Sequence, residues 1–345
     1  MQHFRQISAL GILSDPLTIG AVTLPNRLFL APMSGVSDRP FRDLSASFGA
    51  GMVVTEMVAS ELLADGDRDA LTRAERTRQG PHVVQLAGRE EYWMAEGARA
   101  ATDAGADIID INMGCPAKKV TTGYSGSALM RDLDHALRLI DATVAATPRP
   151  VTLKMRLGWD DSSINAPELA RRAEAAGVRM VTVHGRTRCQ FYDGAADWAA
   201  IRSVKAAVSI PLIANGDMIS ADDLEPMLRL SGADGIMVGR GAYGRPWLPG
   251  HLAVYAATGV HPEAPSGDTL CRLVLAHYEA MIEHYGPEIG VRHARKHLGW
   301  YMDRAAPEAG NLPVLRRAIL TETDHRATIR PLAAWFGETD TRRAA

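Results

Sequence analysis

The sequence is poor in cysteine, in aromatic residues and in long apolar runs. Its 345 residues include only three cysteines, Cys115, Cys189 and Cys271, and 6% aromatic residues. An odd number of widely spaced thiols argues against a disulfide framework or a zinc site, so we expect no metal and a reducing, cytoplasmic setting. We see no uncharged apolar run of membrane-spanning length. The first residues also lack the pattern of a secretory signal.

An excess of one charge is also missing. The chain carries 38 basic and 40 acidic residues, a formal net charge of −2, and this balance alone does not indicate a nucleic-acid partner. Its 46% hydrophobic and 23% charged residues are typical of a globular protein. The length suits a barrel of about 250 residues with an appendage of roughly 90. No obligate protein partner is evident.

Short β-rich runs alternate with longer helical patterns between residues 28 and 247. Each run is apolar on both faces, as a parallel strand buried under helices should be. The runs are Leu28–Met33, Met52–Glu56, Val83–Leu86, Ile108–Asn112, Val151–Arg156, Met180–His184, Pro211–Asn215 and Gly235–Gly239. Eight such units predict a (β/α)8 TIM barrel more than an open doubly wound sheet. Residues before Asn26 are expected to form a short N-terminal lead-in, which we predict to be a hairpin under the barrel.

A break is expected near Pro249–Gly267, where glycine and proline gather, and beyond it apolar residues keep helical spacing. Asp268 is placed as the N-cap of the first helix there. Further helices are expected at Val291–Met302, Leu312–Leu320 and Arg326–Trp335. The predicted division assigns residues 1–250 to the barrel and 251–345 to a small helix bundle.

Basic charge gathers in the second half of this bundle. Residues 292–330 hold eight basic and four acidic side chains. Arg292, Arg295 and Lys296 lie three and four residues apart, so they share one helical face. A solvated face and a strip that contacts RNA phosphates both explain the pattern, and the second suits a structured RNA that is read by shape.

Polar residues stand at the carboxyl ends of the predicted strands, where barrels carry their active sites. They are Met33 and Ser34, Gln85, Asn112 to Cys115, Lys154 and Arg156, His184, Asn215 to Asp217, and Gly239 to Gly241. Packing alone does not explain polar residues at so many strand ends. We therefore expect them to converge on one mouth.

Glycines after the last two strands, Gly216 and Gly239 among them, would let a phosphate approach the backbone. FMN and a phosphorylated substrate both fit this pattern, and tight turns alone are the structural alternative. Lys154, inside a strand, needs an anionic partner at the mouth. A reduced flavin is one such partner, and a Schiff-base lysine or a buried ion pair are the alternatives.

Cys115 lies on the loop after the fourth strand, between a glycine and a proline. A lone cysteine is most often a small buried hydrophobe, but a loop at the catalytic face favours a thiol that donates a proton as a general acid. Lys118 and Lys119 are close in sequence and are expected to tune its pKa. Cys189 and Cys271 are expected to be bystanders.

Five motifs, in order along the chain, resemble those of the tRNA-dihydrouridine synthases, in particular the bacterial B-type or NifR3-like group. They read APMSGVSDRPF at 31–41, DINMGCPAKKV at 110–120, HGRTR at 184–188, ANGD at 214–217 and GR at 239–240. The later VRHARKHLGWY at 291–301 is similar to the helical-domain motif of that family.

The resemblance implies FMN, NADPH as reductant, and reduction of the C5–C6 double bond of a uridine in the tRNA D-loop, at position 17 if the B-type assignment holds. It implies hydride transfer from FMN N5 to C6 and a proton from Cys115 to C5. The residues implied to hold FMN are Pro32, Met33, Ser34, Gln85, Lys154, His184, Asn215, Gly216, Asp217, Gly239 and Arg240. Those expected to meet the substrate are Asn112, Arg156 and Arg186 at the mouth, and Arg292, Arg295 and Lys296 on the bundle.

A uridine stacked in folded tRNA cannot reach a barrel mouth, so it must be extruded. Two other interpretations stay open on the residues alone. One is an FMN barrel that acts on a small molecule, such as a dihydroorotate dehydrogenase. The other is an RNA-binding or regulatory protein that has lost the chemistry.

Overall fold

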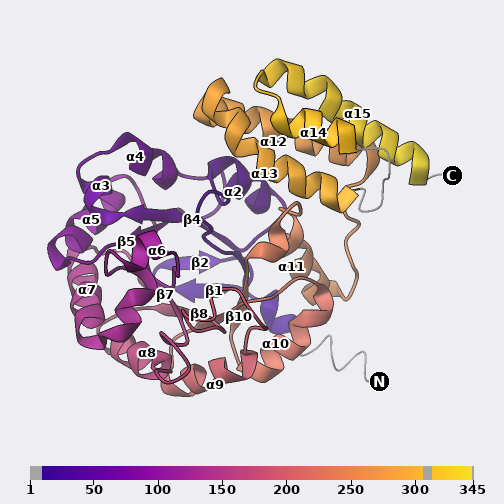
Figure 1. Cartoon of the computed structure of the whole chain (residues 1–345). Coiled ribbons are helices and arrows are strands. Elements are labelled where there is room, and N and C mark those ends of the chain that lie inside the picture. The colour runs from indigo at the N-terminus through magenta and orange to yellow at the C-terminus, as the bar shows by residue number, and fades with distance from the viewer. Residues whose placement is uncertain (1–9, 306–312, 344–345) are drawn as a thin grey trace, which may run out of the picture.

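The computed structural model describes residues 10–305 and 313–343, and its centre is a closed barrel of eight parallel strands (Figure 1). The strands follow the chain around the barrel, and the last pairs with the first. They are β3 (Leu28–Leu30), β4 (Met52–Ala59), β5 (Val83–Ala87), β6 (Ile108–Met113), β7 (Val151–Arg156), β8 (Met180–His184), β9 (Leu212–Asn215) and β10 (Gly235–Val238). All eight predicted strands and the predicted barrel are confirmed.

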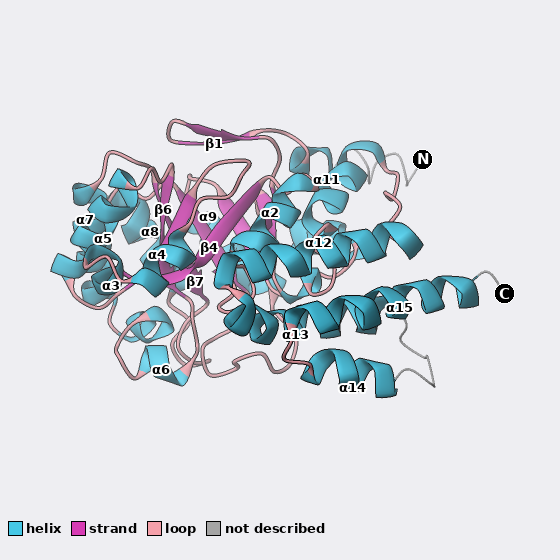
Figure 2. Ribbon diagram, turned by 90° about the horizontal axis from the view of Figure 1, so that it is seen from above, coloured by secondary structure: helices cyan, strands magenta, loops and turns pink. Residues whose placement is uncertain are grey.

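Helices form a ring outside these strands (Figure 1). They are α2 (Arg39–Ser47), α3 (Ser60–Ala64), α4 (Arg68–Ala74), α5 (Glu91–Asp103), α7 (Leu133–Ala146), α8 (Ala166–Ala175), α9 (Trp198–Ala207), α10 (Leu224–Ser231) and α11 (Leu248–Thr258). The short helix α6 (Lys118–Thr121) instead lies beyond the strand ends, as Figure 2 shows. Several begin at an aspartate that accepts a backbone N–H of the first turn, as Asp38, Asp132 and Asp197 do. These caps satisfy amide groups that a helix start leaves unpaired.

A β-hairpin closes one end of the barrel. Strand β1 (Leu17–Ile19) pairs with β2 (Val22–Leu24), and Leu17, Ile19 and Leu24 share a buried cluster with side chains of the barrel interior. Figure 2 shows β1 lying across that end. The predicted hairpin is therefore confirmed, and its apolar plug leaves the opposite end, where the strands finish, as the open mouth.

The chain after the barrel forms a helical bundle with its own core. Its helices are α12 (Gly267–Tyr285), α13 (Pro287–Ala305), α14 (Pro313–Thr321) and α15 (His325–Arg343). Tyr278, Leu298, Leu332 and Trp335 are among the side chains that fill the core. The expected helices are confirmed over the described residues; Leu312, the expected start of the third, lies outside them. None of the described helices is long and apolar enough to cross a membrane.

Two local predictions between the barrel and the bundle are wrong, the start of the break at Pro249 and the N-cap at Asp268. Helix α11 runs through Pro249, which sits in its first turn, where the missing proline N–H has no helical partner to lose. The helix packs against β3, so it belongs to the barrel layer, and it ends at Gly259 with a left-handed φ of +72°. The next helix begins at Gly267 with Ser266 in the N-cap position, which places Asp268 inside its first turn.

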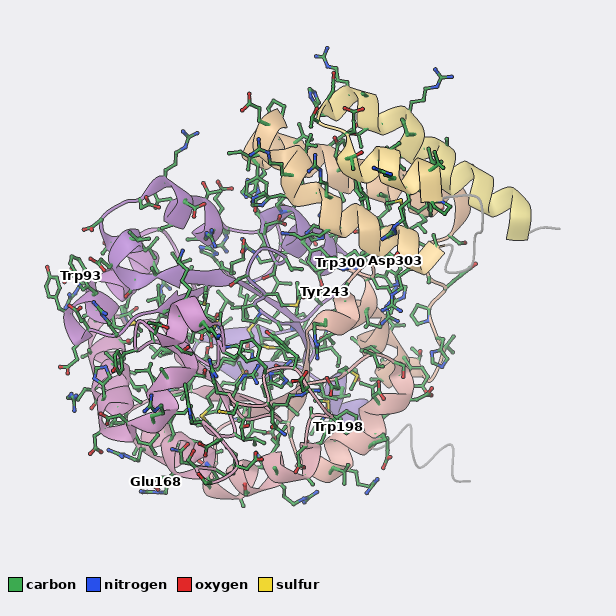
Figure 3. All side chains as sticks on the ribbon, viewed as in Figure 1. Trp93, Glu168, Trp198, Tyr243, Trp300 and Asp303 are labelled. Atoms are coloured by element: carbon green, nitrogen blue, oxygen red, sulfur yellow. The ribbon has the colours of Figure 1, made fainter. Side chains whose placement is uncertain are left out.

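The bundle docks beside the barrel mouth through close contacts. Tyr243, just after β10, stacks on Trp300 of α13 with ring centroids 3.9 Å apart, and Figure 3 shows the two side by side. A Cβ on Gly244 would lie 2.5 Å from the Trp300 carbonyl oxygen, so only glycine fits this approach. Elsewhere in the interface between barrel and bundle, which we call the seam, the Tyr285 hydroxyl lies 3.2 Å from an Asp38 carboxylate oxygen. These contacts place α13 directly against the loops of the mouth.

Candidate active site

A cavity of about 530 Å³ lies at the carboxyl ends of the strands, within the range of small-molecule and cofactor sites. All eleven residues that the sequence assigned to flavin binding line it, together with Asn112, Cys115 and Arg156. The structure also brings in residues that sequence reasoning missed, namely Met57, Phe191, Tyr192, Met218, Ile219 and Tyr243. Phe191 and Tyr192 lie eight residues or fewer beyond the strand-ending His184, on a loop without strand or helix signal.

A buried polar network forms the floor beside β5, β6 and β7. The Gln85 amide donates to Asp110 at 2.6 Å, and the Thr152 hydroxyl donates to the other Asp110 oxygen at 2.5 Å. The Asn112 amide donates to Gln85 at 2.7 Å, while its oxygen accepts the backbone N–H of Cys115 at 3.0 Å. Burial raises the pKa of Asp110. Asn112 thus holds the Cys115 loop, and it also lines the cavity.

The Cys115 thiol is half-buried in the cavity wall. Burial raises its pKa above the ordinary value of 9.0, while the nearby cations Arg156 and Lys154 act in the opposite direction. Arg156 and Lys154 therefore take the role expected of Lys118 and Lys119, and that expectation is wrong. Because the pKa lies above 9.0, the thiol holds its proton at neutral pH.

Lys154 points into the cavity from β7. Its ammonium donates to the side-chain oxygen of Asn215 at 3.1 Å, a neutral partner. Burial and then the Arg156 charge lower the pKa of Lys154 to about 8, against the attraction of Asp110. A buried cation whose direct partner is neutral favours an anionic group in the cavity.

Arg156 and Arg186 tie loops together. The Arg156 guanidinium donates to three carbonyl groups, those of Gly114, Thr187 and Phe191, at 2.9, 2.7 and 2.8 Å. It thereby links the Cys115 loop to the loop after β8. Arg186 is 1% exposed and does not line the cavity. The structure therefore does not bring Arg186 to the surface where a substrate was expected to meet it.

The Arg186 guanidinium pairs with Asp217 through two contacts of 2.6 and 2.9 Å. Asp217 also accepts the Ala196 N–H at 2.8 Å and adopts a left-handed φ of +56°. Arg240, which is more exposed, reaches the same carboxylate at 3.3 Å. This cluster fixes the backbone after β9 next to the glycine turn.

His184 lies against that turn. A Cβ on Gly216 would lie 2.8 Å from His184 Cδ2, and Gly216 has a φ of +119°, so both space and backbone require glycine there. Burial, and then the charges of Lys154, Arg156, Arg186 and Arg240, hold the pKa of His184 well below its usual value. The imidazole is therefore neutral, and it faces an anion only as a hydrogen-bonding group.

The three basic residues of the bundle do not form one exposed strip. Arg292 is exposed, whereas Arg295 is half-buried and donates to the Glu322 carbonyl at 2.9 Å. The Lys296 ammonium lies 3.2 Å from where a Cβ on Gly35 would be, in the seam with the barrel, and burial lowers its pKa. The helical face is shared, as predicted, but it packs against two neighbours, so only Arg292 of the three points into solvent.

Comparisons with known proteins identify the family of the chain. Residues 29–329 match the family model of dihydrouridine synthase (Dus). The chain is 55% identical over 326 residues to a probable tRNA-dihydrouridine synthase of Rhizobium leguminosarum bv. phaseoli, which covers 94% of this chain and 100% of that relative. It is 47% identical over 285 residues to tRNA-dihydrouridine synthase B of Pseudomonas putida, over 82% of this chain and 85% of that one.

Among solved structures, histamine dehydrogenase from Rhizobium sp. 4-9 aligns with a TM-score of 0.58 at 14% identity, over 96% of this chain and 65% of that one. At that identity the likeness is one of fold. The match to the family model, by contrast, runs from the first barrel strand into the last described helix. The sequence identity to the relative from Rhizobium leguminosarum exceeds one half. The chain therefore belongs to the dihydrouridine synthase family of oxidoreductases.

Proposed function

We propose that this chain reduces the C5–C6 double bond of a uridine in the tRNA D-loop, with FMN as cofactor and NADPH as reductant. One observation carries the proposal: a protonated thiol, Cys115, and a cation with only a neutral direct partner, Lys154, face the same cavity. The thiol suits a proton donor to carbon, and the cation suits a flavin that has gained negative charge. Position 17 is the target that the resemblance to the B-type group implies.

The residues present fit FMN. The backbone of Pro32–Ser34, with Gln85 and Lys154, would hold the ring system, and Lys154 would gain the anionic partner that it lacks. Gly216, Gly239 and Arg240 would hold the phosphate; a Cβ on Gly239 would meet nothing closer than 4.0 Å, so the backbone there lies open to a ligand. When bound, reduced FMN supplies the hydride for C6 of the uracil.

Cys115 completes the addition at C5. Its S–H bond breaks as the new C5–H bond forms, which leaves a thiolate at Cys115. Arg156 and Lys154, the two cations that already act on this sulfur, stabilise that thiolate until solvent returns a proton. Asn112 acts on the reaction through the Cys115 backbone, and Arg186 acts through Asp217; both are positioning residues in this proposal.

The bundle would hold the tRNA while the uridine is extruded into the mouth. We assign Arg292 to a phosphate contact because it is the exposed member of the basic set. Arg295 and Lys296 instead position α13, through Glu322 and through the loop at Gly35. We place the end of the catalytic barrel at Thr258, the last residue of α11.

Affinity for reduced FMN, whose ring is anionic, should fall as pH rises through about 8, the pKa of Lys154. An anion that binds the protonated ammonium raises that pKa, so binding takes up a proton. The dissociation constant should therefore rise by up to about tenfold per pH unit above the unliganded pKa. Anaerobic titration of deflavinated protein with chemically reduced FMN, from about pH 7 to about pH 9, measures this. Lys154→Met should bind reduced FMN weakly and without this slope; an equal slope in that variant would refute the assignment.

The function itself is tested by incubating the purified protein with FMN, NADPH and an unmodified tRNA transcript, followed by mass-spectrometric mapping of dihydrouridine. We expect product at one D-loop uridine and none elsewhere. A parallel reaction with NADH tests the reductant, and reactions with free uridine monophosphate and dihydroorotate test the small-molecule alternative. Flavin reduction without dihydrouridine in tRNA would contradict the proposal.

A further inference from the structure

The loop that follows Cys115 is built as a closed unit on the cysteine itself. Ser127 donates to the Cys115 carbonyl through both its backbone N–H, at 3.1 Å, and its hydroxyl, at 2.8 Å. Gly126, with a φ of +61°, makes the return turn, and a Cβ there would lie 2.9 Å from the same carbonyl oxygen. Residues 116–126, which we name the α6 loop, are thus anchored at their base to the proposed proton donor.

Tyr124 stands out in the α6 loop. Its side chain is 69% exposed, and its backbone has a φ of +55°. The left-handed region is costly for an aromatic residue and free for glycine, which this loop uses in that conformation at Gly126. A tyrosine held there, with its ring in solvent, adds nothing to the core. Packing therefore does not explain why a tyrosine stands at this position.

Two lysines lie in the same loop as Tyr124. Lys118 and Lys119 are both exposed on α6, and among the described residues neither has an ion-pair partner. Exposed arginines on the outer helices are mostly paired; Arg138 with Glu91 and Arg171 with Glu168 are examples. The α6 loop thus presents an aromatic face and two unpaired cations together.

The loop also lies on the mouth side of the barrel. In Figure 2, α6 projects beyond the strand ends on the side opposite β1, the same side as α14 of the bundle. An RNA held by the bundle and placing one nucleotide in the mouth comes within reach of this loop. Aromatic rings that stack on unpaired bases, with lysines on the phosphates beside them, are the usual means of holding a single strand.

We propose that the α6 loop is a second RNA contact, in which Tyr124 stacks on the unpaired base next to the extruded uridine and Lys118 and Lys119 bind the flanking phosphates. The inference rests on the proposed function, since it takes tRNA as the substrate. Stacking on this loop also bears on Cys115, because the loop base is tied to the cysteine carbonyl. RNA would thereby help to position the thiol.

The test compares Tyr124→Gly with Tyr124→Phe and Tyr124→Trp, using FMN-loaded full-length protein and unmodified tRNA. Tyr124→Gly removes the ring and relieves the backbone, so its thermal midpoint should equal or exceed that of the wild type. Its dissociation constant and KM for tRNA should rise by about 5-fold to 100-fold, while NADPH-driven flavin reduction without tRNA stays unchanged. Phe and Trp should bind as the wild type does. Lys118→Ala with Lys119→Ala should lower the salt slope of binding by about two.

The matched control is Tyr92→Ala, because Tyr92 is similarly exposed, at 65%, on helix α5 of the barrel wall. It should leave tRNA binding unchanged. Wild-type tRNA affinity in Tyr124→Gly, or equal losses in Tyr124→Phe and Tyr124→Gly, would overturn the inference. Dihydrouridine formation by the wild type is scored separately, so a protein that binds tRNA without reducing it would sink the proposed function while the binding series still decides the role of the loop.

Discussion

Cys115→Ala should bind FMN and be reduced by NADPH as the wild type is, yet form dihydrouridine about 10²-fold to 10⁴-fold more slowly, the usual contribution of a general acid. The reason is that in the proposed mechanism C5 takes its proton from this thiol. Burial keeps that thiol protonated at neutral pH, and Arg156 and Lys154 stabilise the thiolate left behind. Single-turnover reactions of pre-reduced protein with tRNA would measure the effect without interference from the NADPH half-reaction.

Two sets of variants make this result specific. Cys189→Ala and Cys271→Ala remove thiols that do not line the cavity, so both should react at the wild-type rate. Cys115→Ser keeps an O–H of similar size but is a much weaker acid, so it should lie near the alanine variant. Because the Cys115 pKa is raised, the wild-type rate should hold through neutral pH and fall only above about pH 9. A wild-type rate in Cys115→Ala would refute the assigned role.

Asp217→Ala should cost about 3–5 kcal/mol of unfolding free energy, because it leaves the Arg186 guanidinium buried without its counter-ion. Arg186 is 1% exposed and makes both of its short charged contacts with this carboxylate. Urea unfolding of the protein without FMN would measure the loss, so that a change in FMN affinity does not contribute to it. FMN binding, titrated separately, should weaken as well, since Asp217 holds the strained turn beside Gly216 at the proposed phosphate site.

The control for this prediction is Arg240→Ala. Arg240 reaches the same carboxylate at 3.3 Å, but its side chain is 46% exposed, so its removal should cost only about 0–1 kcal/mol. The double variant Arg186→Met with Asp217→Ala should be more stable than Asp217→Ala alone, since it removes the unpaired charge. A double variant that is no more stable than the single one would show that the aspartate matters for the turn alone.

Strand positions and strand-end residues were predictable because both follow local rules. Alternation of apolar runs and helical patterns marked all eight strands, and barrel closure brings every strand end to one face. That reasoning correctly predicted that the residues of the flavin set and Cys115 lie together at one cavity. It missed Tyr192 and Tyr243, because they lie on loops, where no periodic pattern predicts which way a side chain points. It also missed Asp110, which lies inside the predicted strand rather than at its end.

Other outcomes depended on contacts between distant parts of the chain. Arg186 and Asp217 are 31 residues apart, and the Lys296 ammonium meets a loop near residue 35. A polar side chain that touches a ligand and one that holds a loop have the same local sequence signature. Arg186 and Lys296 were therefore expected at the substrate, and the structure places them on a carboxylate and at the domain seam. Asn112 lines the cavity as expected and also holds the Cys115 backbone.

The sequence by itself thus determined the barrel, the presence of a helical bundle, the strand-end residues of the flavin set and the family. These depend on periodicity and on motifs read within a few residues of each other. The tertiary structure alone decided that the Cys115 thiol stays protonated, that Lys154 has only a neutral direct partner, and that the basic face of α13 is divided between solvent and seam. Burial and charge at a given atom are sums over neighbours from the whole chain, so no local pattern contains them.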